Sequence, residues 1–193
     1  MVLAGATLCS VAIMGWIVWS ERQVSPPPSS GQAVQAPPIA APAPRDVDAT
    51  RVATLEASAV SSPEDASPRV SLGDLYFEAE RFEDAIPWYE QAIALNPSDL
   101  DASTSLGVSY YYAGQTERAI EAFERSLEVA PSNQRALLSL GIVRAFGLQD
   151  LEGAITAWEQ VVAIAPDSPE GVAAQDSLDR LRAVHGSTDV DLR

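Results

Sequence analysis

Side chains that could support catalysis or bind a metal are few and scattered in this sequence. The single cysteine, Cys9, lies in an apolar N-terminal stretch, and the single histidine, His185, lies near the C-terminus among small and acidic residues. Carboxylates are abundant, with 27 Asp and Glu residues, but they follow the spacing of helix surfaces. No nucleophile with a nearby base, glycine-rich phosphate loop or cluster of metal ligands accompanies them. The sequence therefore predicts no enzyme, no cofactor, no metal site and no small-molecule substrate.

Tyrosine offers a different kind of chemistry. Three of the five tyrosines, Tyr110, Tyr111 and Tyr112, are consecutive. On a helix, consecutive side chains point roughly 100° apart, so these three rings cannot share one environment. A tyrosine ring combines apolar area with a hydroxyl group, which suits contact between proteins. The roles of the three rings depend on the helices that position them.

The charge of the chain limits its partners. The formal net charge is −15, from 12 basic and 27 acidic residues, and every basic residue is arginine. A surface this acidic repels phosphate backbones, which argues against nucleic-acid binding. With one cysteine, the chain cannot form an internal disulfide.

The N-terminal part differs from the rest of the chain. Residues 2–20 carry no charged side chain, and as a helix they would span about 30 Å, the thickness of the bilayer core. Residues 1–20 are therefore predicted to be a transmembrane anchor. Residues 21–46, rich in Pro, Ala and Ser, are predicted to be a flexible spacer. Arg22 favours a cytoplasmic position for the chain that follows the anchor, but one basic residue leaves the orientation open.

The remainder of the chain repeats. Prolines recur at 63, 97, 131 and 166, which gives separations of 34, 34 and 35 residues. A glycine in mid-helix is explained where a second helix approaches closely, and a proline ends the helix before it. Alignment on the prolines gives three matching columns, which are Gly73, Gly107 and Gly141; Ala85, Ala119 and Ala154; and Tyr89, Phe123 and Trp158.

This pattern resembles the tetratricopeptide repeat family, whose unit of 34 residues is an antiparallel helix pair with a closing proline. The resemblance implies an all-α fold, an α-solenoid of three helix pairs. The expected parts are a half-repeat helix at 47–61, a repeat domain at 62–184 with repeats at 66–99, 100–133 and 134–168 and a capping helix at 169–184, and a disordered tail at 185–193.

In that family the first helix of each pair lines a concave groove, and the resemblance implies which residues face it. They are Ser67, Val70, Asp74, Phe77 and Glu78 in the first repeat, Asp101, Thr104, Val108, Tyr111 and Tyr112 in the second, and Arg135, Leu138, Ile142, Ala145 and Phe146 in the third. This set is mostly apolar and aromatic, with an acidic rim. It predicts a protein or peptide partner with apolar anchors and basic flanks. Leu138 and Ile142 have the alternative of packing against neighbouring helices or the cap.

Three further expectations concern structure. Tyr110 shares a repeat column with Tyr76 and is predicted to be core, which leaves Tyr111 and Tyr112 for the groove. Arg144 occupies the same column in the third repeat, so it needs an acidic partner, for which Asp150, Glu152 and Glu159 are candidates. Serines after the closing prolines are predicted to cap the next helices, and these are Ser98, Ser132 and Ser168.

The first hypothesis for the function is a membrane-anchored bacterial scaffold or chaperone-like adaptor for an envelope assembly, with the repeats outside the cytoplasm. Anchor, spacer and repeats are architecturally similar to the tetratricopeptide proteins of cytochrome c maturation. The alternative is a structural subunit whose repeats face the cytoplasm and organise a membrane complex. Family members that grip acidic C-termini use Lys and Asn in the groove. Val70 and Asp74 occupy the first two of those positions here, which argues against that ligand.

Overall fold

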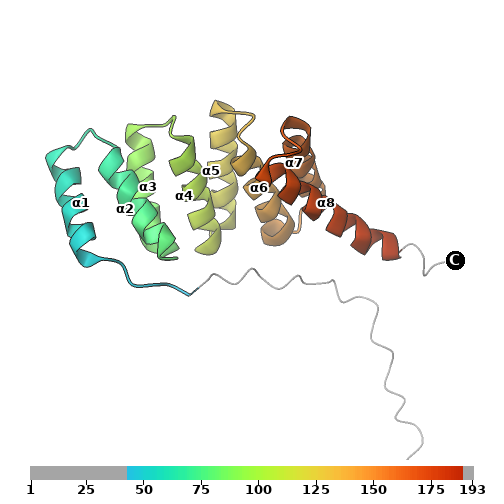
Figure 1. The fold of residues 1–193 in the computed structure, drawn as a ribbon, viewed down its shortest axis with the longest axis horizontal. Helices are drawn as coiled ribbons and strands as arrows, with labels where there is room; N and C mark the ends of the chain where they lie inside the picture. The colour runs from blue at the N-terminus through green and yellow to red at the C-terminus, as the bar shows by residue number, and fades with distance from the viewer. Residues whose placement is uncertain (1–42, 189–193) are drawn as a thin grey trace, which may run out of the picture. The chain divides into compact units, whose positions relative to one another are not determined.

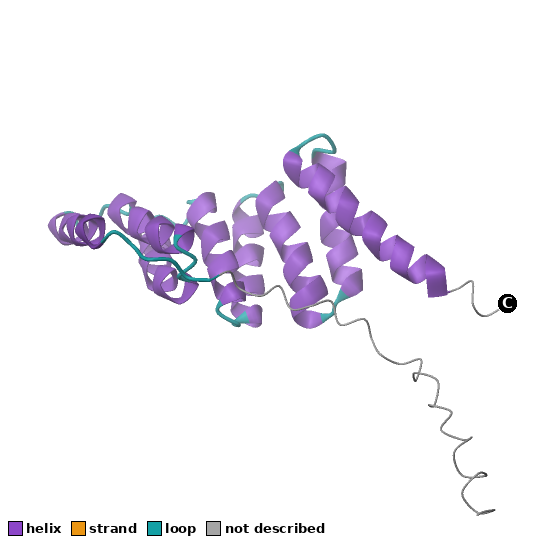
Figure 2. Cartoon of the chain, turned by 60° about the horizontal axis from the view of Figure 1, so that its bottom comes forward, coloured by secondary structure: helices purple, strands orange, loops and turns teal. Residues whose placement is uncertain are grey.

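The computed structural model describes residues 43–188, and side chains as far as residue 183. The predicted anchor at 1–20 and most of the predicted spacer at 21–46 lie outside the described residues, as do residues 189–193 of the predicted tail. Among the helices of the described part, none is both long enough and apolar enough to span a bilayer. The regular elements of residues 43–188 are helices, without strands, as the sequence predicted (Figure 2).

The helices follow the predicted repeats closely. They are α1 (Ala49–Ser61), α2 (Ser67–Glu78), α3 (Phe82–Leu95), α4 (Leu100–Tyr112), α5 (Thr116–Val129), α6 (Gln134–Val143), the π-helical turn η1 (Arg144–Leu148), α7 (Leu151–Ile164) and α8 (Pro169–Thr188). Each predicted repeat contains one pair, which is α2 with α3, α4 with α5, or α6 with α7. The half-repeat is α1. The cap, α8, continues beyond 184 to Thr188, so the predicted tail begins inside a helix.

The helices stack in chain order, each packing against the next (Figure 1). α2 also contacts α4, α4 contacts α6, and α6 contacts α8, whereas contacts of this extent are missing between α3 and α5 and between α5 and α7. The first helices therefore form one closely spaced layer, and the second helices form another. We call them the first-helix layer (α2, α4, α6 and α8) and the second-helix layer (α3, α5 and α7). Closer spacing makes the first-helix layer the inner, concave side of the stack.

The glycine column brings the two helices of each pair together. A Cβ atom at Gly73 would lie 2.6 Å from the ring of Tyr89. The same atom would lie 2.5 Å from the Phe123 ring at Gly107 and 2.3 Å from the Trp158 ring at Gly141. The three rings are buried, with exposed fractions of 0%, 0% and 1%. Each ring thus lies on the glycine of its own pair, which explains why both columns repeat.

The helix caps differ in part from the prediction. Ser168 caps α8, because its Oγ accepts a hydrogen bond from the backbone N–H of Gly171 at 3.0 Å. Ser98 and Ser132 do not cap α4 and α6. Instead, the side chain of Asp99 accepts from the N–H of Ala102, and that of Asn133 accepts from the N–H of Ala136. In both cases the extended residue that begins the helix lies one position later than predicted, and Asp and Asn are equally good caps.

The extra residue of the third repeat forms a π-helical turn. α6 ends at Val143, and η1 continues the chain from Arg144 to Leu148 with a wider turn. Gln149 closes it in the left-handed conformation, with φ of 58°. Phe146 and Leu148 are 45% and 47% exposed there. An inserted residue commonly widens a helix in this way, and such turns are frequent at functional sites.

Arg144 pairs with Glu124, so the predicted partners Asp150, Glu152 and Glu159 are wrong. Its guanidinium lies 2.9 Å from Oε1 of Glu124 on α5. Glu124 is the repeat equivalent of Glu90, 34 residues earlier. Glu90 accepts hydrogen bonds from Tyr110 and Arg118, the equivalents of Arg144 and Gly153. Arg144, the first residue of η1, therefore supplies the positive charge that Arg118 supplies from α5. Gly153 leaves room for its guanidinium, because a Cβ atom there would lie 2.8 Å from Nη1 of Arg144.

Arg144→Ala is expected to lower the free energy of unfolding by about 1 kcal/mol, because the Arg144 side chain is only 28% exposed and a partly buried ion pair is weakly screened. This corresponds to a melting temperature about 2–4 °C lower, measured by circular dichroism. Arg135→Ala is the matched control. Its pair with Asp101 has side chains 55% and 87% exposed, so its loss should change Tm by about 1 °C or less. Weakened partner binding without a change in Tm would instead place Arg144 in the binding site.

Tyr110 is buried, as predicted, with 2% of its surface exposed. Its hydroxyl donates to Glu90, and the Arg118 guanidinium lies 4.2 Å from its ring centroid. Burial, together with the hydrogen bond and charge of Glu90, raises the pKa of Tyr110 from 10.0 to about 12. The ring therefore joins the first two repeats through both apolar and polar contacts.

A raised tyrosine pKa makes stability depend on pH in the alkaline range. The unfolded chain loses the Tyr110 proton near pH 10, and the folded chain retains it to about pH 12. The contribution is therefore complete below pH 10 and is lost as the pH rises toward 12. We expect urea midpoints to fall between pH 9 and 11.5, and to fall less steeply in Tyr110→Phe. An equal slope in both chains would contradict the assignment.

Candidate partner-binding site

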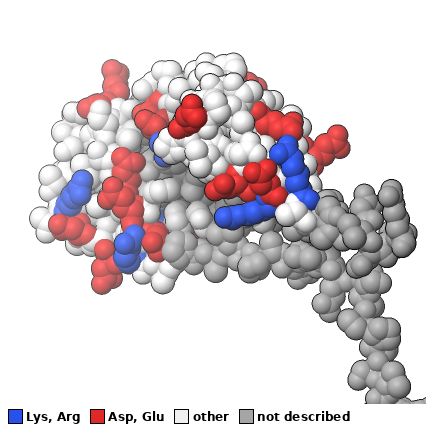
Figure 3. Space-filling model, turned by 45° about the vertical axis from the view of Figure 1, so that its right-hand side comes forward, with Lys and Arg blue, Asp and Glu red and all other residues white. Residues whose placement is uncertain are grey.

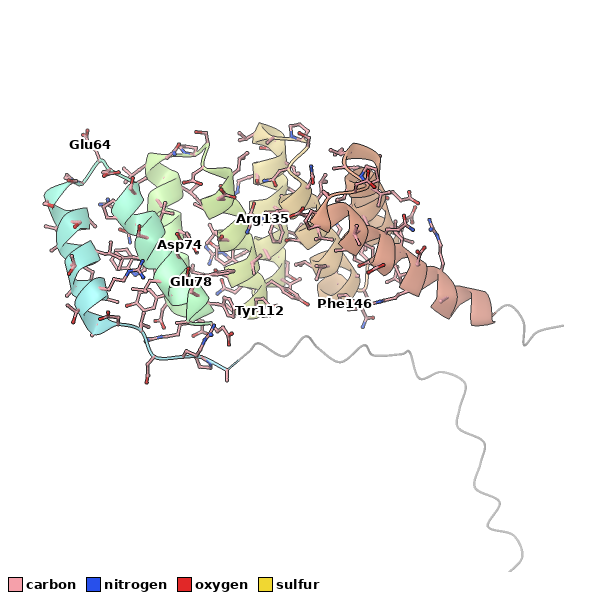
Figure 4. All side chains as sticks on the ribbon, in the orientation of Figure 1. Glu64, Asp74, Glu78, Tyr112, Arg135 and Phe146 are labelled. Atoms are coloured by element: carbon pink, nitrogen blue, oxygen red, sulfur yellow. The ribbon has the colours of Figure 1, made fainter. Side chains whose placement is uncertain are left out.

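The predicted groove residues lie on the first-helix layer and on η1, which follows α6, with different degrees of exposure. Asp74, Arg135 and Phe146 are exposed. A second group is half-buried and comprises Val70, Phe77, Val108, Tyr111, Tyr112, Leu138 and Ile142. Figure 4 shows Asp74, Glu78, Tyr112, Arg135 and Phe146 on the ribbon, with Tyr112 and Phe146 along its lower edge. Most of the predicted set is thus accessible on one layer.

Thr104 does not belong to this surface. It is 2% exposed, and its hydroxyl donates to the carbonyl oxygen of Leu100 at 2.7 Å. The Asn133 side chain, which caps α6, lies 3.4 Å from the same hydroxyl. α6 therefore covers this turn of α4, and the position that faces the groove in the family is closed here. Ala145 is likewise buried, with 7% exposed.

The aliphatic members of the set form the floor of this surface. Val70 and Val108 pack against the core that extends from α3 to α6. Leu138 and Ile142 pack against the second core, built from α6, η1, α7 and α8. The alternative prediction for Leu138 and Ile142, packing against neighbouring helices, is confirmed in this respect, although both keep part of their surface exposed. Their packing makes the floor rigid.

Aromatic rings gather where α2 and α4 end. Phe77 meets Phe82 edge to face, with ring centroids 5.4 Å apart. Phe82 stacks on Tyr112 at 4.5 Å with an interplanar angle of 18°. Tyr112 in turn contacts Tyr111, with centroids 5.6 Å apart. The sequence singled out three of these rings but missed Phe82, which begins α3 and lies outside the first-helix positions.

η1 extends the aromatic row to the third repeat. A Cβ atom at Gly147 would lie 2.6 Å from Cγ2 of Thr116 and 3.4 Å from Cε2 of Tyr111. The π-helical turn therefore packs directly beside Tyr111, with Phe146 exposed next to the contact. We call Phe77, Phe82, Tyr111, Tyr112 and Phe146 the aromatic edge, in which Phe82, with 7% exposed, is the buried ring that supports Phe77 and Tyr112. The sequence had named four of these five residues as groove residues, Phe146 among them.

Carboxylates border the aromatic edge and the floor. Asp74 accepts a hydrogen bond from the Tyr89 hydroxyl at 2.8 Å. Partial burial, with smaller contributions from Glu78, Asp99 and Asp101, raises the pKa of Asp74 above its usual value, against the effect of the Tyr89 bond. Acidic side chains also predominate on the face shown in Figure 3. Exposed carboxylates, those of Asp74 and Glu78, therefore lie on the same layer as the apolar floor.

Comparison with known families agrees with this geometry. Residues 73–114 match a model described as "TPR repeat", and residues 104–169 match one described as "Tetratricopeptide repeat". Together the matches run from 73 to 169, half of the 193-residue chain. The chain belongs to the tetratricopeptide repeat family. Tetratricopeptide repeats generally form scaffolds for protein interaction.

Solved tetratricopeptide structures share the fold. A crystal structure of MamA is 21% identical, covers 69% of this chain and 81% of its own, and has a TM-score of 0.59. YrrB, described as having an unusual peptide-binding site, is 22% identical, covers 65% and 64%, and has a TM-score of 0.58. The second repeat domain of human RPAP3, in complex with the HSP70 peptide SGPTIEEVD, is 21% identical, covers 57% and 92%, and has a TM-score of 0.52. No curated protein matches the sequence.

Proposed function

We propose that the repeat domain binds a peptide or helical segment of a partner protein on the first-helix layer, with the aromatic edge as its main anchor. The observation that supports this most directly is the series of ring contacts from Phe77 through Phe82 and Tyr112 to Tyr111, beside which the π-helical turn that carries Phe146 packs. An apolar segment laid across the stack would contact all three repeats at once. MamA, YrrB and RPAP3 support the fold of this surface, and the YrrB and RPAP3 descriptions show that such folds bind peptides.

The chemistry of the aromatic edge suits recognition. Tyrosine and phenylalanine supply large, rigid contact areas at a low entropic cost, and they commonly dominate the affinity of protein interfaces. Here the rings are held by one another and by the core before any partner arrives. Because the site is ordered in advance, binding loses little conformational entropy. The hydroxyls of Tyr111 and Tyr112 provide the polar contacts that fix the orientation of a bound segment.

The charge around the site predicts the flanks of the partner segment. Asp74, Glu78 and Asp101 lie on the first-helix layer. Among their three carboxylates in the described structure, that of Asp101 forms an ion pair with an arginine, Arg135 at 3.0 Å. The chain as a whole has a net charge of −15. We therefore expect basic residues beside the apolar anchors. A peptide such as the acidic HSP70 segment bound by RPAP3 would be repelled.

The test is capture of partners by the tagged full chain, extracted in mild detergent from cells that express it. We compare wild type with a Tyr111→Ala, Tyr112→Ala double variant, and expect capture of specific partners to fall at least about 10-fold. The matched control is a Leu95→Ala, Val129→Ala variant, whose residues are 41% and 56% exposed on the second-helix layer. Its capture should equal wild type. Equal capture by all three chains, with unchanged melting temperatures, would reject the proposed site.

The proposal includes a membrane tether. The 19 uncharged residues from 2 to 20 support an anchor, and the Pro-rich segment after them supports a spacer. A role in envelope assembly, cytochrome c maturation included, requires the repeats outside the cytoplasm. The alternative, a structural subunit that organises a membrane complex, requires the repeats to face the cytoplasm. A C-terminal reporter that is active only outside the cytoplasm distinguishes the two, and a silent reporter would reject the first.

A further inference from the structure

Asp74 interrupts the apolar floor of the site at one position. The same position of the repeat holds Val108 in the second repeat and Ile142 in the third. Both of those side chains pack against the cores, whereas Asp74 is charged and exposed. Packing between helices therefore does not account for the residue type at this position of the first repeat.

The buried ring that lies against Asp74 differs in the same repeat. Tyr89 fills the column that holds Phe123 and Trp158, and it is the member of that column with a hydroxyl group. This hydroxyl donates to Oδ1 of Asp74 at 2.8 Å, although the residue as a whole is 0% exposed. The same ring meets Phe77 edge to face, with centroids 6.4 Å apart. Tyr89 thus fixes the carboxylate and the first ring of the aromatic edge relative to each other.

Asp74 lies where a bound segment crosses α2. Val70 of the floor is four residues before it, and Phe77 of the aromatic edge is three residues after it. Side chains at these separations are neighbours on one face of a helix. Figure 4 shows Asp74 on this helix, one turn before the labelled Glu78. A segment that contacts both the floor and the aromatic edge on α2 therefore covers the Asp74 carboxylate.

A covered carboxylate at this place requires a positive charge from the partner. Partial burial already raises the pKa of Asp74 above its usual value. The ion pairs of the described residues do not include Asp74. A carboxylate that loses its remaining water without gaining a cation is strongly unfavourable. Phe77 beside it also suits a cation, because aromatic faces attract ammonium and guanidinium groups.

We infer that Asp74 is a specificity-determining residue of the proposed site, that it pairs with an arginine or lysine of the bound segment, and that Tyr89 is its positioning residue. The inference rests on the proposed function, since it assigns a ligand group to one residue of the same surface. It also fixes a register, because the basic residue lies on the first repeat while apolar residues contact the aromatic edge. Asp101, which already pairs with Arg135, is not the main contact.

The test uses the full chain in detergent micelles and, as probe, a phage-displayed library of random peptides. Peptides selected by wild type should share an arginine or lysine at a fixed spacing from an apolar residue. One such peptide is then synthesised with a fluorescent label, together with a neutral form in which norleucine replaces the basic residue. By fluorescence anisotropy, wild type should bind the neutral form about 10-fold more weakly.

Asp74→Asn keeps an acceptor for the Tyr89 hydroxyl and removes the charge. Its affinities for the two peptides should therefore agree within about 2-fold. The matched control is Glu121→Gln, which removes one charge from an exposed position of α5 on the second-helix layer. This control should retain the difference of about 10-fold between the peptides.

Tyr89→Phe tests the positioning role, because it keeps the ring on Gly73 and removes the hydroxyl. The difference between the peptides should fall to about 3-fold. Asp74→Val combined with Tyr89→Phe copies the pair Val108 and Phe123 of the second repeat, so this variant should fold and should not prefer the charged peptide. If Tyr89→Phe lowered only the melting temperature and kept the 10-fold difference, Tyr89 would have a structural role alone.

Other outcomes separate this inference from the proposed function. Selected peptides without basic residues, or an equal loss on neutralising the peptide in wild type and Asp74→Asn, would overturn the inference. The proposed function would survive either result if the Tyr111→Ala, Tyr112→Ala variant no longer bound the selected peptides. If that variant bound them as tightly as wild type while the Asp74 dependence held, the aromatic anchor would be rejected and the charge recognition would stand. A library that gave no binder of wild type would reject both.

Discussion

Gly107→Val is expected to lower the free energy of unfolding by about 3 kcal/mol. The new side chain would displace the Phe123 ring, which packs directly on Gly107 between the two helices of the central repeat. A Cβ atom at this position would lie 2.5 Å from Cε1 of Phe123 and 2.7 Å from its Cζ. Phe123 is fully buried and cannot move aside without displacing the core. The stability lost corresponds to a melting temperature about 6–12 °C lower.

Thermal and urea unfolding, followed by circular dichroism, measure this effect. Gly114→Ala is the matched control, since nothing lies within 4 Å of a Cβ atom there, although φ is +74°. The equivalent positions in the other repeats are Glu80 and Gln149, with φ of 62° and 58°. A side chain is therefore tolerated in this conformation, and the control should cost about 1 kcal/mol. If both variants lost the same stability, close packing would not be the reason for the glycine column.

Trp158→Ala is expected to destabilise the domain by about 3–5 kcal/mol, the usual cost of removing a buried aromatic ring. The ring is 1% exposed and belongs to the core of the third repeat and the capping helix. Its Nε1–H also donates to the carbonyl oxygen of Leu138 at 3.2 Å. Because whole domains are stable by only about 5–15 kcal/mol, the third repeat and α8 should unfold at markedly lower urea concentrations.

Two comparisons make the Trp158 prediction specific. Trp158→Phe should cost less than half as much, since Phe123 fills the equivalent position in the second repeat. Trp88→Ala, at a half-buried position on α3, should also cost less than half as much. Urea midpoints give the order of the three variants. A Trp88 variant as unstable as the Trp158 variant would show that the aromatic column is not the main support of the stack.

Repetition made the fold predictable from the sequence. Gly107 and Phe123 are ambiguous taken singly, but their recurrence at 34 residues identifies a contact that every pair must make. The second helix of each pair ends two residues before its closing proline, as expected from the proline spacing. The predicted repeats at 66–99, 100–133 and 134–168 each contain one observed pair. The recurrence of the same buried residue types at a fixed spacing is therefore what makes a helical stack of this kind predictable from its sequence.

Deviations from the repeat could not be predicted in the same way. The partner of Arg144 was predicted among residues nearby in sequence, but it is Glu124 on α5. Glu124 is the repeat equivalent of Glu90, which accepts hydrogen bonds from Tyr110 and Arg118. Which residue caps each helix depends on which residue after the proline has an extended backbone. The residue types alone do not determine whether that residue is Ser98 or Asp99. The conformation of η1 depends on how one inserted residue is absorbed, which is decided by packing against Thr116 and Tyr111.

The candidate site was predicted from the positions of its residues in the repeat, and the burial of individual side chains in the structure corrected that prediction. Tyr111, Tyr112 and Phe77 lie together as a surface, while Thr104 is covered by α6 and its cap. Phe82 was missed because rules based on first helices ignore the start of second helices. Contacts between rings of different helices, such as Phe82 with Tyr112, become visible only when both helices are placed.

Site-specific photo-crosslinking tests most directly whether the aromatic edge is where partners bind. A benzophenone amino acid replaces Tyr112 in one full chain and Val129 in another. Val129 is 56% exposed on the second-helix layer. In cells that express the chain, irradiation should crosslink the partner to position 112 and leave position 129 without adducts. Crosslinks at position 129 with none at position 112 would contradict the account.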